Sequence, residues 1–199
     1  MNKIKAVVFD FDGMTFLTHE RFSHRLYHDF HIPKEKILDF FKKEFEDCKR
    51  GKKDLKKVLE PYLKEWRYKN SVDELLGYWF KDGELNFKIL PLLHQLKQRN
   101  ILRVLCTNNE KHRIDYLKKY FQLDTLFDKI ITSYETGVLK PEKEILKNVL
   151  DSTHLQAQEI LFCDDKEEHI SPLKQFGFLT LHFTTLELFE KELHNLNLL

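Results

Sequence analysis

The clearest guide to the fold of this protein is the stretch Lys5-Ala6-Val7-Val8-Phe9-Asp10-Phe11-Asp12-Gly13. Its apolar run 6–9 is short, rich in β-branched residues and unbroken, which is typical of a strand buried on both faces of a parallel sheet. The run ends abruptly in two carboxylates that one residue separates. The stretch therefore predicts a central strand that carries Asp10 and Asp12 at its carboxyl end.

The same pattern returns later in the chain. Four further segments carry a strand signal, strong in the first two and weaker in the others: 101–106, 160–163, 129–132 and 178–181. Helix-like segments at 92–98 and 142–150 precede the two strong ones. Strands that alternate with helices of this length indicate βαβ units and a parallel sheet covered on both faces. The predicted fold class is α/β, with a doubly wound, Rossmann-like parallel sheet.

One interval breaks this alternation. About ninety positions separate the first strand from the next, whereas a βαβ unit needs only about thirty. The interval contains no convincing strand but four amphipathic segments: 20–30, 34–45, 55–66 and 75–80. Ser71 and Glu74 have the spacing of a capping box, Asp54 can cap the third segment, and Pro61 predicts a kink or an early end within it. We expect a small helical-bundle domain over 16–83, inserted into a core domain of 1–15 and 84–199.

The composition excludes several classes of protein. The 199 residues include 33 Lys and Arg against 32 Asp and Glu, so the net charge of +1 provides no field to attract nucleic acid or an acidic membrane. The three cysteines form no C-x-x-C pair and suggest neither a disulfide framework nor a zinc site. No stretch approaches the roughly 18 apolar residues of a membrane span, and the run 6–9 is too short for a signal peptide. We expect a cytoplasmic protein.

Polar groups gather where the strands end. Asp10 and Asp12 follow the first strand, the segment 107–109 follows the second strong one, and Asp164 and Asp165 follow the third. Ligands of open α/β sheets bind beyond the carboxyl ends of the strands, so these groups are expected to converge. Lys140, which precedes Pro141 shortly after the weak strand 129–132, belongs to the same edge.

This set of residues has a chemical meaning. Four carboxylates in one small space cannot all stay ionised without compensation, and an all-oxygen set of ligands favours Mg²⁺. Lys140 adds a positive charge, while the Thr107 hydroxyl and the backbone N–H groups that follow it add donors for a tetrahedral anion. These are the parts of a phosphoryl-transfer site. Without a P-loop or a glycine-rich nucleotide loop, the phosphoryl donor need not be a nucleoside triphosphate.

Four motifs carry a family resemblance. In order and spacing, the segments 10–13, 105–108, 137–141 and 162–165 resemble the four motifs of the haloacid dehalogenase superfamily. The insertion after the first motif resembles the helical cap of the subgroup that includes sugar-phosphate phosphatases and the phosphatase domain of soluble epoxide hydrolase. Met14 departs from the pattern, because the family usually has Thr or Val there, but this apolar side chain should not touch the phosphate.

The resemblance implies a role for each motif residue. Asp10 would attack phosphorus and form an aspartyl-phosphate. Asp12 would protonate the leaving oxygen, then activate the hydrolytic water, and its backbone carbonyl would bind Mg²⁺. Thr107 and Asn108 would hold phosphate oxygens, and Lys140 would neutralise the phosphate and the nucleophile.

The remaining candidate residues concern the metal ligands and the helical cap. Asp165 is expected to bind Mg²⁺ directly, with Asp164 as a partner of water or of Lys140, although the reverse assignment is open. Related caps turn at a basic residue followed by glycine and point that turn at the substrate, so Arg50 is a candidate substrate-binding residue. His24 and His28 have the i, i+4 spacing of a metal pair, but without a third ligand they are expected to lie on a solvated helix face.

These observations predict a Mg²⁺-dependent phosphomonoesterase that acts on a small phosphorylated metabolite, with a sugar phosphate as first choice and neither nucleic acid nor membrane as partner. One alternative is a phosphomutase that uses the same aspartyl-phosphate. Another is a non-catalytic metabolite-binding protein of the same fold. Dehalogenase chemistry is disfavoured because those enzymes lack the second acid that Asp12 supplies, and the oligomeric state stays open.

Overall fold

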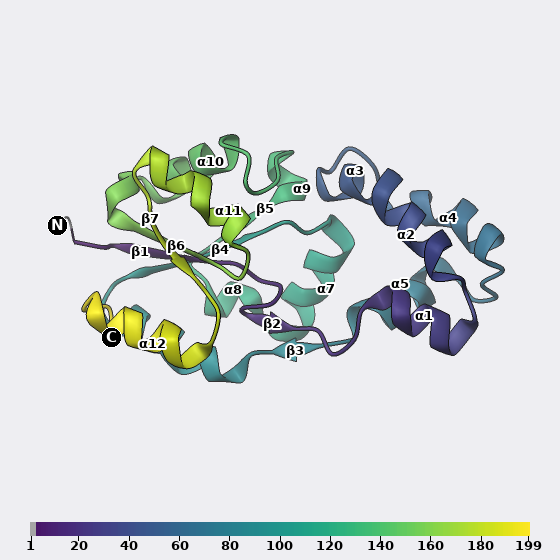
Figure 1. The fold of residues 1–199 in the computed structure, drawn as a ribbon, viewed down its shortest axis with the longest axis horizontal. Coiled ribbons are helices and arrows are strands. Elements are labelled where there is room, and N and C mark those ends of the chain that lie inside the picture. Colours follow the sequence, from purple (N-terminus) through teal and green to yellow (C-terminus); the bar gives the residue numbers. More distant parts are fainter. Residues whose placement is uncertain (1–2) are drawn as a thin grey trace.

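The computed structural model describes residues 3–199 and is built around a five-stranded parallel sheet with the order β5-β4-β1-β6-β7 (Figure 1). Its central strand β1 pairs in parallel with β4 on one side and with β6 on the other. The strands are β1 (Ala6–Phe9), β4 (Leu102–Thr107), β5 (Lys129–Thr132), β6 (Ile160–Asp164) and β7 (Leu179–His182). The α/β class and all five strands expected for the sheet are confirmed, including the two weaker ones.

Helices cover both faces of the sheet because successive residues of a strand point to opposite sides. Val7 and Phe9 enter one hydrophobic cluster, and Ala6 and Val8 enter another. The first cluster is completed by α6 (Leu90–Gln98), α7 (Lys111–Phe121), α8 (Leu123–Leu126) and α12 (Leu186–Asn195). The second is completed by α10 (Glu144–Thr153), α11 (Glu167–Ile170) and the 3-10 helix Ser171–Phe176. This double coverage explains why the strands are apolar runs rather than alternating ones.

The inserted residues form five helices with a hydrophobic cluster of their own. They are α1 (Phe22–Phe30), α2 (Lys34–Lys43), α3 (Phe45–Lys49), α4 (Leu55–Trp66) and α5 (Val72–Phe80). Both expected caps are present: Asp54 accepts the N–H groups of Lys56 and Lys57, and Ser71 forms a capping box with Glu74. The early end expected at Pro61 is wrong. Pro61 is exposed, and α4 continues past it because Leu59 and Trp66 are buried on either side.

A short antiparallel ribbon joins the two parts of the molecule. β2 (Phe16–Leu17) pairs with β3 (Glu84–Leu85), so the chain leaves and re-enters the core side by side. The sequence showed no strand between 16 and 83, because a strand of two residues is too short to display an alternation of period two. We keep 1–15 and 84–199 against 16–83 as our proposal for the domains, and the ribbon lies at that boundary.

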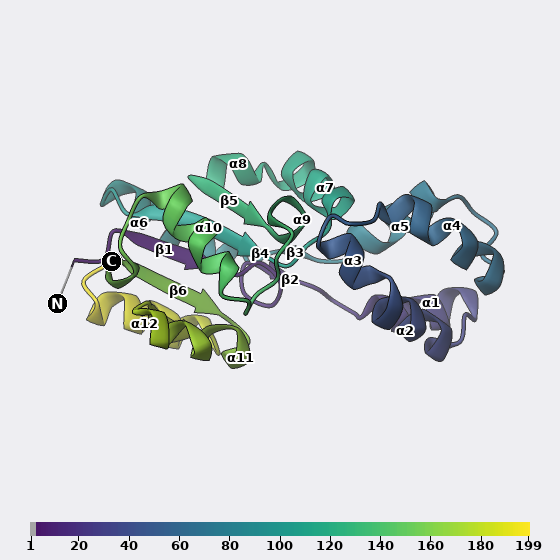
Figure 2. The same ribbon diagram turned by 90° about the horizontal axis from the view of Figure 1, so that it is seen from above.

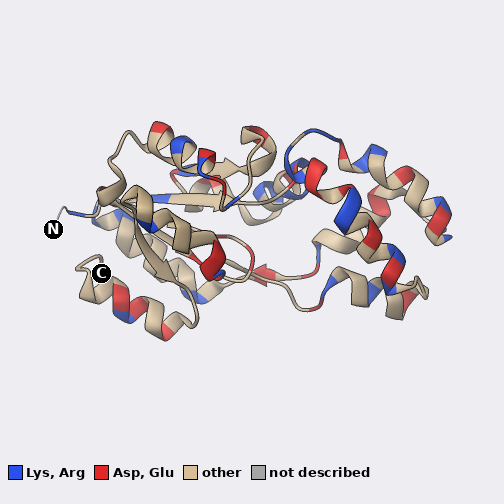
Figure 3. Ribbon diagram, turned by 45° about the horizontal axis from the view of Figure 1, so that its top comes forward, with Lys and Arg blue, Asp and Glu red and all other residues tan. Residues whose placement is uncertain are grey.

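The remaining elements are short connections: the 3-10 helices Phe87–Ile89 and Ala157–Glu159, and the single turn α9 (Ser133–Thr136). Seen from above, the strands of the sheet run toward the helical part of the molecule (Figure 2). Basic and acidic residues are interspersed along the ribbon in both parts (Figure 3). Within residues 3–199, no helix combines the length and the apolar character needed to cross a membrane.

Candidate active site

The carboxyl ends of β1, β4 and β6 bring the predicted residues together, as expected. Asp10 follows β1, Thr107 ends β4, Asp164 ends β6, and Lys140 reaches the same place from the loop after α9. All four are buried, at 5%, 2%, 0% and 4% exposure respectively. Their burial is unusual for polar groups and means that each must find its partner within the site.

Lys140 lies between two carboxylates. Its Nζ donates to Asp10 Oδ1 at 2.5 Å and to Asp164 Oδ2 at 2.7 Å. Burial by itself lowers the pKa of Lys140, but the two carboxylates outweigh it and hold that pKa above its ordinary range. The ammonium group is therefore a fixed positive charge at the base of the site.

The two carboxylates that share Lys140 differ in their surroundings. Burial raises the pKa of Asp10 to about 7, and although Lys140 opposes this rise, the nearby Asp164 carboxylate adds to it. Burial also acts on Asp164, but hydrogen bonds from His169, Lys140 and the backbone N–H of Lys166 lower its pKa to about 2. The His169 Nδ1 atom lies 3.0 Å from Asp164 Oδ1. Asp164 is thus a permanent anion, whereas Asp10 depends on further positive charge to stay ionised at neutral pH.

Asp165 completes a cluster of oxygen atoms suited to a cation. Carboxylate oxygens of Asp10, Asp164 and Asp165 lie within 4.8 Å of one another. Asp165 Oδ1 is buried and has no hydrogen-bond partner within residues 3–199. Burial, assisted by the Asp164 carboxylate, raises the pKa of Asp165. The site thus holds three carboxylates but one ammonium group, and one buried carboxylate oxygen is left without a partner in residues 3–199. This group of oxygen ligands fits a hard divalent cation such as Mg²⁺.

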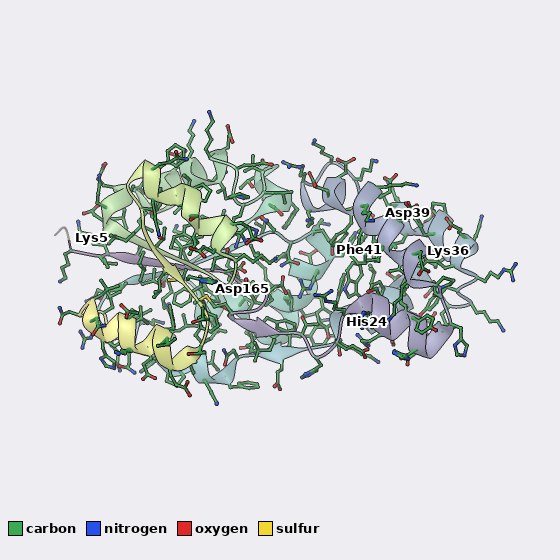
Figure 4. The ribbon with its side chains drawn as sticks, viewed as in Figure 1. Lys5, His24, Lys36, Asp39, Phe41 and Asp165 are labelled. Carbon is green, nitrogen blue, oxygen red and sulfur yellow. The ribbon has the colours of Figure 1, made fainter. Side chains whose placement is uncertain are left out.

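Gly13 allows Asp165 to come this close. Its φ is +87°, and a Cβ atom at this position would lie 2.3 Å from Asp165 Oδ2. A side chain there would therefore displace the carboxylate as well as strain the backbone. In Figure 4, Asp165 lies between the sheet and the helical part, whereas His24 lies within the helical part. His24 and His28 contribute to no metal-binding group in the described part of the chain.

Asp12 faces a partner that the sequence analysis missed. Arg113, in the first turns of α7, donates to both of its oxygens, from Nη2 to Oδ1 at 2.5 Å and from Nη1 to Oδ2 at 2.8 Å. Asn109 Nδ2 donates to the same Oδ2 at 2.8 Å. Burial opposes ionisation of Asp12, but Arg113 and Asn109 together lower its pKa below the ordinary range. The sequence offered no direct signal for this contact, because Asn109 lies in the loop before α7 and only the fold brings Arg113 to Asp12.

Asn108 contacts the backbone of Lys140. Its Nδ2 donates to the Lys140 carbonyl at 3.0 Å, and its Oδ1 accepts the Lys140 N–H at 2.8 Å. Both ends of the amide are thus engaged, which fixes the loop that presents the Lys140 ammonium group. A contact of Asn108 with phosphate stays a prediction.

Arg50 lies at the contact between the inserted helices and the core. Its guanidinium pairs with Glu142, with a second bond from Nη1 to Glu142 Oε2 at 2.9 Å, and also with Glu46. A Cβ atom on the following Gly51 would lie 2.2 Å from the Tyr134 carbonyl oxygen, so the turn packs closely on α9. The turn does face the core near the Lys140 loop, but the guanidinium is engaged by carboxylates. A contact with substrate stays a prediction.

Comparisons with known proteins agree on one family. The sequence profile of haloacid dehalogenase-like hydrolases matches residues 4–177. The bifunctional epoxide hydrolase 2 of Rattus norvegicus is 28% identical over 115 residues, which are 56% of this chain and 21% of that protein. The GMP/IMP nucleotidase YrfG of Escherichia coli is 30% identical over 88 residues, which are 44% of this chain and 40% of that protein. The chain thus spans less than half the length of both relatives.

The fold has solved counterparts. A HAD family enzyme from Bacteroides thetaiotaomicron superimposes with a TM-score of 0.82 at 21% identity, covering 94% of this chain and 99% of that one. The same enzyme was also solved as a complex with magnesium and inorganic phosphate, which superimposes with a TM-score of 0.79 at 20% identity. The likeness extends over both the sheet and the inserted helices, since nearly the whole chain is covered.

Proposed function

The chain belongs to the haloacid dehalogenase-like hydrolases, and we propose that it is a Mg²⁺-dependent phosphomonoesterase that forms an aspartyl-phosphate on Asp10. The observation that carries this proposal is the contrast between two carboxylates two residues apart. Asp10 is buried and bound by Lys140, while Asp12 is bound by Arg113 and Asn109. A nucleophile and a separate proton carrier need such different surroundings.

Asp10 is the proposed nucleophile. One of its oxygens is held by Lys140, so the other can attack phosphorus and displace the ester oxygen. Lys140 keeps positive charge beside the attacking carboxylate and the incoming phosphate throughout. The Thr107 hydroxyl, at the end of the neighbouring strand, would donate to a phosphate oxygen.

The oxygens of Asp10 and Asp165 and the backbone carbonyl of Asp12 would hold Mg²⁺, while Asp164 stays with Lys140 and His169. When bound, the cation neutralises charge on the carboxylates and on the phosphate. The unpaired Oδ1 of Asp165 and the full set of partners on Asp164 favour Asp165 as the direct ligand.

Asp12 is the proposed proton carrier. In its protonated form it would give a proton to the leaving ester oxygen, and as a carboxylate it would then take one from the water that attacks the aspartyl-phosphate. The pairing with Arg113 favours the carboxylate and hence the second role. The first role requires that the bound phosphate supply or share a proton.

A sugar phosphate is the substrate we propose first, and a nucleoside monophosphate is the alternative that the similarity to a GMP/IMP nucleotidase favours. A phosphomutase would use the same residues but return the phosphoryl group to the substrate. A binding protein without catalysis is hard to reconcile with the complete set of Asp10, Asp12 and Lys140.

The test is phosphate release by the purified chain from sugar phosphates, nucleotides and phospho-acids, with Mg²⁺ or with excess chelator. We expect release that needs Mg²⁺ and that disappears in Asp10→Asn but not in the surface control Asp151→Asn. Release that survives in a folded Asp10→Asn protein would contradict the covalent route. Isomerised sugar phosphate without free phosphate would identify a mutase, and binding without any product would favour the non-catalytic alternative.

A further inference from the structure

Asn109 is a buried amide that binds Asp12 but has no further role in the mechanism above. It lies in the loop between β4 and α7, is 2% exposed, and has three polar neighbours. Its Nδ2 atom donates to Thr107 Oγ1 at 2.7 Å and to Asp12 Oδ2 at 2.8 Å, and its Oδ1 atom accepts from Arg113 Nη1 at 2.6 Å. One side chain thus contacts both the proposed phosphate ligand and the proposed proton carrier.

The orientation of this amide follows from the chemistry of its neighbours. A guanidinium group can only donate hydrogen bonds, so the atom of Asn109 that faces Arg113 must be the oxygen. The NH₂ group then faces Thr107 and Asp12, and each of its two hydrogens has one acceptor. The opposite orientation would set donor against donor at Arg113 and acceptor against acceptor at ionised Asp12.

The amide in turn decides where the Thr107 hydroxyl can point. Because Thr107 Oγ1 accepts a hydrogen from Asn109, its own hydrogen cannot lie along that bond. Within residues 3–199 no acceptor takes this hydrogen in a hydrogen bond. Thr107 also ends the strand that pairs with β1 just before Asp10, where the pair Phe9 and Leu105 is the last of the register. The hydroxyl is left as a free donor at the place where a phosphoryl group would meet Asp10.

Arg113 and Glu110 hold the amide in place from the helix side. The carboxylate of Glu110 accepts the backbone N–H groups of His112 at 2.8 Å and Arg113 at 2.6 Å, which fixes the first turn of α7. From that turn the Arg113 guanidinium bridges Asp12 and Asn109 and lies 5.6 Å from the centre of the Phe16 ring. Asn109, Asp12 and Arg113 thus form a closed ring of hydrogen bonds, and Thr107 is attached to this ring through Asn109.

We propose that Asn109 is a positioning residue that aims the Thr107 hydroxyl at the transferring phosphoryl group and fixes the Asp12 carboxylate beside the leaving oxygen. This inference rests on the proposed function, because it takes Thr107 and Asp12 in the roles given above. Two independent measurements follow, one for each hydrogen of the amide.

The first measurement is the binding of inorganic phosphate by calorimetry in the presence of Mg²⁺. Asn109→Ala frees the hydroxyl to turn away, and we expect the affinity for phosphate to fall about tenfold, the worth of one oriented hydrogen bond to an anion. In a Thr107→Val background the same change should have almost no effect, because no hydroxyl remains to be aimed. An equal loss in both backgrounds would overturn this half of the proposal, and so would a wild-type chain that binds no phosphate.

The second measurement compares two substrates by kcat/KM, which covers the steps up to formation of the aspartyl-phosphate. An alkyl phosphate needs a proton on its leaving oxygen, whereas 2,4-dinitrophenyl phosphate does not. We expect Asn109→Ala to lose about tenfold more on the alkyl ester than on the aryl ester, and we expect this difference to vanish in an Asp12→Asn background. An equal loss on the two esters would refute the link to Asp12.

Controls separate positioning from folding. Arg103→Lys disturbs a buried arginine at the opposite end of β4, whose guanidinium holds Asp128 through two hydrogen bonds, and it should change neither phosphate affinity nor the ester ratio. If Asn109→Ala does not fold, Asn109→Asp keeps the shape and an acceptor for Arg113 but can no longer donate to Thr107 as an ionised group. If the wild-type chain binds phosphate but hydrolyses no ester, the proposed function fails, and the phosphate-binding cycle alone decides the role of Asn109.

Discussion

Asp10→Asn should make the metal-free protein more stable, although it removes the proposed nucleophile. Asp10 is 5% exposed, shares the Lys140 ammonium group with Asp164, and has a pKa raised to about 7 by burial. Keeping it ionised therefore costs free energy of folding at neutral pH, and a neutral amide of the same shape avoids that cost.

The size of the effect follows from the pKa. A rise from the ordinary value of 3.8 to about 7, at about 1.36 kcal/mol per pH unit, corresponds to roughly 4 kcal/mol. Because the folded pKa is the higher one, the unfolded chain releases its proton first. The cost is absent below pH 3.8, grows between pH 3.8 and 7, and is complete above pH 7. The wild-type chain should lose stability relative to Asp10→Asn as the pH rises through this window.

The assay is urea unfolding in excess chelator at several pH values from 4 to 8. Asp164→Asn is the matched control. The pKa of that buried carboxylate is lowered to about 2, so its ionised form stabilises the folded state, whereas the ionised form of Asp10 destabilises it. The stabilisation by Asp164 is present above pH 3.8 and is lost only as the pH falls toward 2, so at pH 7 the control should be less stable than wild type by about 2 kcal/mol.

Two results would refute this reasoning. One is an Asp10→Asn protein that is less stable than wild type at pH 8 without metal. The other is a difference between the two proteins that does not shrink toward pH 4. Addition of Mg²⁺ should stabilise the wild-type chain more than Asp10→Asn, since a bound cation offsets the cost of the carboxylate.

Three further changes test the site. Asp12→Asn should lower kcat by about 10² to 10⁴, the range of a general acid or base, and a loss below tenfold would mean that another group carries the proton. Gly13→Ala should weaken Mg²⁺ binding in calorimetry by at least about tenfold, because the added Cβ atom would meet Asp165 Oδ2. Gly137→Ala is the control: its φ of +76° imposes similar backbone strain, but no atom lies within 4 Å of the added Cβ, so the Mg²⁺ affinity should stay unchanged. Arg50→Ala should change the ratio of kcat/KM among phosphorylated metabolites more than it changes the rate on p-nitrophenyl phosphate. If Glu142→Gln changes that ratio in the same way, Arg50 acts by tying α3 to the Lys140 loop and not by contacting the substrate.

The sheet, and the edge of it at which the site residues gather, can be predicted from the amino-acid sequence. The largely apolar runs at 6–9, 101–106 and 160–163, of which only the second contains a charged residue, Arg103, are local patterns, and each is followed at once by polar residues. Parallel strands end at a common edge, so no knowledge of packing was needed to bring Asp10, Thr107 and Asp164 together. The caps at Asp54 and Ser71 were equally readable, because a capping hydrogen bond spans only two or three residues.

The side chains that surround these residues depend on how the helices pack against the sheet, which the sequence patterns do not reveal. Asp12 and Arg113 are 101 positions apart, and their contact depends on how α7 is rotated against the end of β1. The same holds for Glu142 and Arg50, which are 92 positions apart. Helical periodicity gives the face on which a residue lies but not the rotamer, the neighbour or the distance. Those follow from the packing of the whole core, and therefore the strand-end residues were predictable while the network that orients them was not.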